Sequence, residues 1–284
     1  MLNVRFVILW LAFMLLCLPC RGRHRVEDRL IFDEYVSHIE PFGAGAIADV
    51  IIETARFFLD RPYVASTLEK EPEQLTVNLR EFDCTTFVET VLALSHTVKS
   101  SAHPAFEDFC EKLQQIRYRN GIVSDYTGRL HYFTDWIYEN EKSGFVRDVT
   151  KEAGGKPYKP DLDFMSSHPE RYRQLKSNSG FAGILRKKER EISERNVYSI
   201  LPEAEIKAGE DAVKEGDIVC FVTDIKGLDV SHVGFIHRHA GQLTFIHASS
   251  SAKKVIINPQ PVREYVGQSP HTKGLMIVRP QDRE

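Results

Sequence analysis

The sequence predicts an α+β protein in which helices come first and pack on an antiparallel sheet built from the last third of the chain. Apolar residues recur at helical spacing from about residue 30 to residue 196, and beyond Leu201 the spacing changes to that of strands. Turn residues separate the later apolar runs so closely that successive strands are expected to pair as an antiparallel meander.

Composition is that of an ordinary globular protein. The chain has 284 residues, of which 42% are hydrophobic and 27% charged, and its formal net charge is -3. This balance gives no global electrostatic reason to bind nucleic acid or an anionic membrane. A small polar or zwitterionic substrate fits the composition better.

Residues 1–22 are typical of a targeting segment. An apolar run covers Phe6 to Leu18, which is shorter than the roughly 20 residues that a membrane-spanning helix needs. We therefore expect a secretory signal peptide. An uncleaved N-terminal anchor is the alternative, because no small-x-small cleavage pattern is present and basic residues follow the run. Lipidation of Cys20 is disfavoured, because Pro19 precedes it.

The helical part divides at recognisable boundaries. Two helices are predicted between Leu30 and Leu59, the second ending before Pro62, since proline cannot continue a helix. Asp83 is a good N-cap, so a helix is expected to begin at Cys84. The stretch that follows is predicted to be mainly helical, with a stop at Asn120-Gly121, a start at Ser167 and Pro169, and a solvated charged helix at LRKKEREISER.

Five short strands are predicted after the turn at Gly216-Asp217. They cover the runs IVCFVT, HVGFIHRH, LTFIHASS, KVIINP and LMIVRP.

Cys84 is the candidate nucleophile. Beyond the targeting segment it is accompanied by Cys110 and Cys220, and the three are spaced too far apart for a disulfide framework or a CxxC metal site. A thiol in the first turn of a helix gains from the helix dipole and lies close to unpaired N–H groups, which can also stabilise an oxyanion. The alternative is a small buried hydrophobe, the interpretation that we give to Cys110 and Cys220.

A nucleophilic cysteine needs a base, and two histidines on neighbouring strands are candidates. His232 opens one predicted strand and His247 lies near the end of the next. If the turn centres on Ala240-Gly241 with an even number of loop residues, His239 pairs with Gln242. His232 and His247 then share one face of the sheet, within reach of each other.

A zinc site is the competing interpretation of these histidines. His237 has the opposite strand parity to His232, and no HExxH motif or nearby carboxylate completes a ligand set. We therefore predict no metal site and expect His237 and His239 on the surface of the hairpin end.

At these residues the chain resembles the NlpC/P60 superfamily of papain-like cell-wall hydrolases. Five segments follow the order of that family's motifs: LDRPYV, DCTTFV, GDIVCF, HVGFI and FIHA. The resemblance implies a papain-like core with Cys84 as nucleophile, His232 as general base and acid, and His247 as the residue that orients His232. It also implies that Tyr63 lines the active site and that Asp83 contacts substrate or only caps the helix.

The resemblance extends beyond this core. The stretch between Cys84 and His232 is longer than the family minimum, which implies a catalytic domain over 28–284 with a mainly helical insertion at about 100–201. The segments YVASTLE, NLREFDCTTFVE and RLHYFTDWI are similar to the N-acetylmuramoyl-L-alanine amidase-like branch. His131, Asp135 and Trp136 would then line the cleft, with an ordinary amphipathic helix start as the alternative.

This resemblance implies a cofactor-free cysteine amidohydrolase that cuts the amide between N-acetylmuramic acid and L-alanine of muropeptides through a thioester. The rivals are a D-γ-glutamyl-diamino acid endopeptidase, a non-catalytic wall-binding module and a metal amidase. We expect a monomer exported to the periplasm or cell envelope, without nucleic-acid partners and in contact with a membrane only through an N-terminal anchor.

Overall fold

A computed structural model describes residues 26–282, so the predicted targeting segment at 1–22 lies outside the described residues. The helices are α1 (Val26–Ile39), α2 (Ile47–Phe57), α3 (Cys84–Ser100), α4 (Phe106–Arg117), α5 (Phe133–Lys142), α6 (Phe164–Ser167), α7 (Arg173–Ser177), α8 (Ser179–Glu194), α9 (Ile206–Gly209) and α10 (Val262–Gln268), with 3-10 turns η1 (Arg119–Gly121), η2 (Tyr126–Gly128), η3 (Pro169–Arg171) and η4 (Glu203–Glu205). The predicted helices on either side of residue 45 and the start at Cys84 are confirmed.

The described residues form one antiparallel sheet of eight strands. Its strands are β1 (Val146–Asp148), β2 (Lys156–Pro157), β3 (Ser199–Pro202), β4 (Ile218–Thr223), β5 (Val230–His239), β6 (Gln242–Ser249), β7 (Lys254–Ile257) and β8 (Thr272–Pro280). Strands β4 to β7 form the predicted meander. The sequential pairing predicted for the fifth strand was wrong: β8 pairs with β4 and not with β7, because α10 lies between β7 and β8 in the sequence, packs on the sheet and carries the chain back to β4. The strand order is β2-β3-β8-β4-β5-β6-β7, with β1 also on β8.

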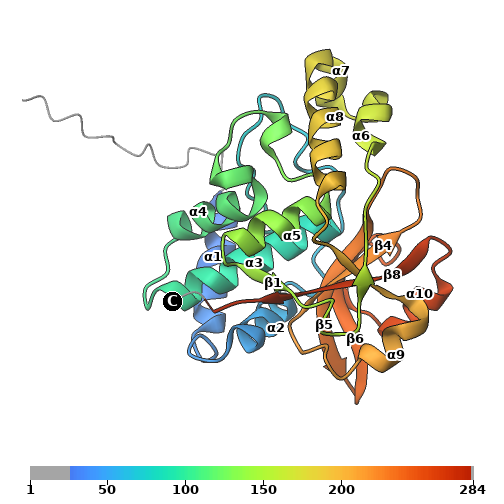
Figure 1. Cartoon of the computed structure of the whole chain (residues 1–284). Helices are drawn as coiled ribbons and strands as arrows, with labels where there is room; N and C mark the ends of the chain where they lie inside the picture. The colour runs from blue at the N-terminus through green and yellow to red at the C-terminus, as the bar shows by residue number, and fades with distance from the viewer. Residues whose placement is uncertain (1–25, 283–284) are drawn as a thin grey trace, which may run out of the picture.

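Both faces of the sheet are covered (Figure 1). Alternate residues of the central strands point to opposite faces, so that Cys220, Phe235 and Ile246 join the core shared with the helices. Their neighbours Phe221, Ile236 and Phe245 join a second core with Val262 and Val266 of α10. Helix α3, almost entirely buried, packs against β5 and β6 from the first side.

The β5-β6 hairpin has the predicted register. Ala240 and Gly241 form the turn with φ angles of 51° and 78°, values that suit the two central residues of a type I′ turn. His239 pairs with Gln242 across it, as predicted. The hairpin therefore carries His232 and His247 on the same face of the sheet.

Several local features differ from the prediction. The mainly helical stretch also contains β1, β2 and β3, which are too short to give a clear alternating pattern. Pro169 opens a 3-10 turn, whereas Ser167 ends α6. The surface placement of His237 was wrong: it is 3% exposed because its Nδ1 lies 2.6 Å from Glu215 Oε1, while His239 is exposed as expected.

No helix among residues 26–282 combines the length and apolar character needed to cross a membrane.

Candidate active site

Cys84 occupies the first position of α3. Asp83 is the N-cap: its carboxylate accepts a 2.8 Å hydrogen bond from the Thr86 backbone N–H, and the Thr86 hydroxyl accepts a 2.9 Å bond from the Asp83 N–H. This reciprocal capping box fixes the start of the helix. Cys84 therefore lies at the positive end of α3 and is partly exposed, whereas Cys110 and Cys220 are buried, as predicted.

The two imidazoles meet directly. His232 Nε2 and His247 Nδ1 are 2.6 Å apart, and the rings are nearly perpendicular, at 83°. The aromatic rings of Phe221, Phe245 and Tyr265 surround His232, with centroids 5.7 to 6.3 Å away. This apolar wall removes water from the pair and holds the two rings in a fixed relation.

Cys84 approaches the same strand from the α3 side. Its sulfur is within hydrogen-bonding reach of the backbone of Val233, the residue after His232. Among the described residues, the thiol has no hydrogen bond to His232 itself. Catalytic hydrogen bonds are often long before substrate binds, so this spacing is compatible with a nucleophile and its base.

Burial shifts the pKa values of this site toward the neutral forms. It raises the pKa of the Cys84 thiol to about 12, and the Asp83 carboxylate adds to the rise. It lowers the pKa of His232 to about 4 and that of His247 to about 3. These shifts favour the thiol form of Cys84 and the neutral form of both imidazoles at neutral pH.

Two tyrosines stand beside the thiol. Tyr63 lies next to Phe82 in a short parallel bridge, and burial followed by the charge of Cys84 raises the pKa of its hydroxyl. Burial, followed by the charge of Cys84, also raises the pKa of Tyr265 on α10. Sequence reasoning missed Tyr265 because α10 was not predicted, although Val262, Tyr265 and Val266 have helical spacing after Pro261.

Comparison with known proteins now adds to the geometry. The profile of a family described as N-acetylmuramoyl-L-alanine amidase-like matches residues 53–275, most of the chain. The chain belongs to this amidase-like family. No curated protein matches it.

Solved structures agree with this membership. An N-acetylmuramoyl-L-alanine amidase from Bacteroides uniformis is 36% identical, with a TM-score of 0.79, and the match covers 84% of this chain and 100% of that one. A putative xylanase from Bacteroides fragilis is also 36% identical, with a TM-score of 0.76 and coverage of 80% and 98%. A Legionella pneumophila protein at 22% identity and a TM-score of 0.68, covering 90% and 94%, shares the fold.

The remaining predicted binding residues of this amidase-like protein lie around α5. Trp136 is fully buried and stacks on Phe133 at 4.7 Å, and Asp135, 2% exposed, is held by Arg119 and by Arg195. Burial of this kind favours the packing alternative, and we leave Asp135 and Trp136 out of the proposed site.

His131 is partly buried. Its Nε2 is 2.7 Å from the Tyr126 carbonyl, and burial lowers its pKa to about 3. Its binding role stays a prediction.

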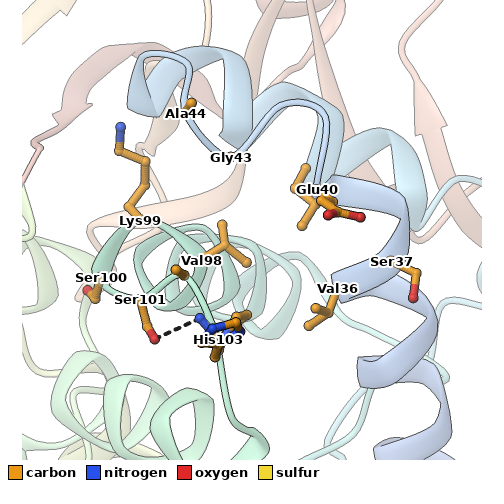
Figure 2. Close-up of a pocket in the computed structure, with 13 residues that line it drawn as sticks. Val36, Ser37, Glu40, Gly43, Ala44, Val98, Lys99, Ser100, Ser101 and His103 are labelled. Carbon is orange, nitrogen blue, oxygen red and sulfur yellow. Dashed lines mark hydrogen bonds between the residues drawn. The ribbon is translucent and has the colours of Figure 1, made fainter.

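Two cavities have linings that include none of Cys84, His232 and His247. Figure 2 shows one of 770 Å³ between the ends of α1 and α3, where Lys99 and His103 contribute. It is roughly 22 Å from Cys84 along α3 and contains none of the predicted site residues. A second cavity of 350 Å³ is enclosed by residues 64–81, the segment that joins Tyr63 to Asp83, with Lys70 and Arg80 in its wall.

Proposed function

We propose that this protein is a cysteine-dependent peptidoglycan amidohydrolase with the papain-like core of the NlpC/P60 superfamily. It cleaves the amide between N-acetylmuramic acid and L-alanine in muropeptides. The single observation that carries the proposal is the pair of bonded imidazoles, His232 and His247, beside a partly exposed thiol at a helix start. Membership of the amidase-like family supplies the substrate class.

In the first half-reaction the Cys84 sulfur attacks the lactyl carbonyl carbon, and His232 takes the thiol proton. The backbone N–H of Cys84, at a helix start where intrahelical partners are lacking, stabilises the oxyanion together with the Tyr63 hydroxyl. The C–N bond then breaks. His232 passes its proton to the departing amine of L-alanine, which leaves a thioester on Cys84.

In the second half-reaction water attacks the thioester. His232 accepts a proton from the water and returns it to the sulfur as the C–S bond breaks. The products are the free sugar acid and a peptide beginning with L-alanine. The shifts favour a neutral thiol and a neutral imidazole, which supports transfer of the proton during attack.

The nearest rival cuts the stem peptide between D-γ-glutamate and the diamino acid with the same cysteine chemistry. Mass spectrometry of digests of defined muropeptides separates the two. We expect released tripeptide or tetrapeptide beginning with L-alanine. A released peptide beginning with the diamino acid, with L-Ala-D-Glu left on the sugar, would contradict the amidase assignment.

Two further rivals are tested in the same digests. A wall-binding module predicts that Cys84→Ala leaves the biological activity intact, and a metal amidase predicts loss of activity with a chelator and resistance to iodoacetamide. We expect Cys84→Ala to abolish activity, a chelator to leave activity unchanged, and iodoacetamide to inhibit it. Cys110→Ala is the matched control, because it removes a buried thiol from α4 and should leave turnover unchanged.

Glycan cleavage is not favoured, despite the name of the Bacteroides fragilis relative. Glycosidases commonly need two carboxyl groups flanking the scissile bond. Among the described residues of the proposed site, Asp83 supplies one carboxylate, which is engaged by Thr86. A wall substrate also agrees with the expected export to the periplasm or cell envelope.

A further inference from the structure

The outer nitrogen of the histidine pair is a buried polar atom that the mechanism above does not use. His247 is 2% exposed, and its Nδ1 faces His232. Its Nε2 is buried and, among the described residues, has no hydrogen bond of ordinary geometry. A buried ring nitrogen of this kind calls for a partner, and the partner decides which nitrogen carries the proton.

Asn258 is placed to be that partner. The β6-β7 ladder pairs His247 with Ile256, and the Asn258 N–H continues it with a 2.8 Å bond to the Phe245 carbonyl. Asn258 is thus opposite Phe245. It lies on the same face of the sheet as His247 and is the diagonal cross-strand neighbour of His247. Asn258 is 7% exposed, so its side chain is largely buried.

The orientation of the Asn258 amide is fixed by its neighbours. Its Nδ2 donates a 2.8 Å hydrogen bond to the Gln260 carbonyl, which leaves Oδ1 as the free acceptor. The Thr244 hydroxyl binds the backbone carbonyls of Asn258 and Gln260 at 2.6 and 2.9 Å, so the loop after β7 is held as well. Such an acceptor suits an imidazole N–H and does not suit an imidazole lone pair.

We infer that Asn258 is a positioning residue that accepts the Nε2 proton of His247 and thereby sets the tautomer of both histidines. His247 Nδ1 is then an acceptor, so His232 Nε2 must donate to it. The lone pair of His232 consequently falls on Nδ1, the nitrogen left to take the Cys84 proton. The tautomer assignment is independent of the proposed function; only the transfer of the Cys84 proton to His232 rests on it.

The surroundings agree with this assignment. A hydrogen bond from His247 to Asn258 opposes the fall in the pKa of His247 that burial and the neighbouring His232 cause. Among the described residues, the Tyr265 ring of α10 lies 6.3 Å from both imidazoles, and burial raises the pKa of its hydroxyl, which favours the neutral form. The amide dipole of Asn258 is therefore the fixed polar influence on the tautomer.

The first test needs no substrate. Nitrogen NMR of the 15N-histidine-labelled protein at pH 7, with His247 assigned through His247→Gln, reports which ring nitrogen is protonated. We expect His247 protonated on Nε2 and His232 also on Nε2. A His247 ring protonated on Nδ1 would overturn the inference, whatever the protein hydrolyses.

The second test measures the rate at which iodoacetamide alkylates Cys84. Asn258→Leu removes the acceptor and should slow alkylation at pH 7 about tenfold or more, because the wrong tautomer deprives the thiol of its base. Asn258→Asp retains an acceptor and should stay within about threefold of wild type. Equal rates in wild type and Asn258→Leu would refute the role.

Thr244→Val is the matched control. It removes the hydroxyl that holds the same loop and leaves the Asn258 amide in place. We expect lower stability with an unchanged alkylation rate. Slowing equal to that of Asn258→Leu would mean that loop rigidity, and not the acceptor, matters. Because alkylation needs no muropeptide, failure here is distinguishable from failure of the amidase assignment.

Discussion

At the scale of single residues, three cysteines of one chain have different environments. Cys84 opens a helix and keeps part of its surface exposed, whereas Cys110 and Cys220 are enclosed in the core. Burial raises the pKa of both the Cys84 and the Cys220 thiols, so acidity alone does not distinguish the proposed nucleophile. The distinguishing features of Cys84 are its access, its helix start and its nearby histidines.

The decline of kcat/KM at low pH should report the protonation of His232. The base must be neutral to accept a proton, and burial lowers its pKa from 6.5 to about 4. We expect kcat/KM, measured on a muropeptide, to stay level as pH falls from 7 to about 5 and to decline toward pH 4. An acid limb centred at or above pH 6.5 would contradict this prediction, provided that circular dichroism shows the protein still folded there.

The proposed role of the Tyr63 hydroxyl in stabilising the oxyanion is testable. Tyr63→Phe removes a donor beside the thiol, and we expect kcat/KM for muropeptide to fall about a hundredfold, the usual loss for one oxyanion donor. Tyr138→Phe, on α5 and stacked against Arg195, is the control and should behave as wild type. Wild-type turnover by Tyr63→Phe would exclude this role.

At the scale of elements, the β5-β6 hairpin brings the histidines together, and its close packing depends on Gly234. A Cβ at this position would lie 2.8 Å from the Ile246 carbonyl oxygen and 3.0 Å from His247 Cβ. We expect Gly234→Ala to cost about 1–3 kcal/mol of unfolding free energy in urea and also to slow Cys84 alkylation, since His247 must shift.

Gly241→Ala separates the two effects. It strains the turn at φ +78°, but a Cβ there meets open space, away from the histidines. It should lower stability while leaving alkylation unchanged. Equal alkylation rates in the two alanine variants would show that the contact with His247 has no effect on the site.

Long, strongly patterned elements could be predicted from the sequence, and short ones could not. Helix α3 and strands β4 to β8 carry clear periodicity, and the capping Asp83 and the Ala240-Gly241 turn mark local boundaries. Strands β1 to β3 have two to four residues each and owe their pairing to β8 and to one another, which only the folded chain provides.

The candidate site was predictable to the same extent. Cys84, His232 and His247 follow from helix capping and strand register, but Tyr265 and Asn258 depend on how the chain turns after β7. The burial of Trp136 and the clamp on Asp135 likewise depend on packing between distant segments, which spacing along α5 does not reveal.

At the scale of the whole molecule, the segment from 100 to 201 is built into the sheet. Strands β1 and β3 both pair with β8, and the Thr134 N–H and hydroxyl bind Asp229 at the start of β5. A buried ion pair of 2.6 Å between Arg117 and Glu89 joins α4 to α3. The segment from 100 to 201 and the rest of the described chain therefore share one set of stabilising contacts.

We accordingly expect a single cooperative unfolding transition in urea. In a Trp10→Phe background, Trp136 fluorescence reports on the inserted segment, and labelling of the Cys220 thiol reports on β4. The two probes should give the same urea concentration at the midpoint of unfolding. A Trp136 transition at clearly lower urea would show that the segment unfolds as a separate unit.

The most direct test of the central claim is the identity of the group that Cys84 carries during turnover. Wild-type protein is mixed with a defined muropeptide, quenched in acid within the first turnover, and digested for mass spectrometry. We predict a thioester on the Cys84 peptide whose mass is that of the muramoyl sugar without the stem peptide. A Cys84 adduct that still contains L-Ala-D-Glu, or turnover with the adduct on another residue, would contradict the account.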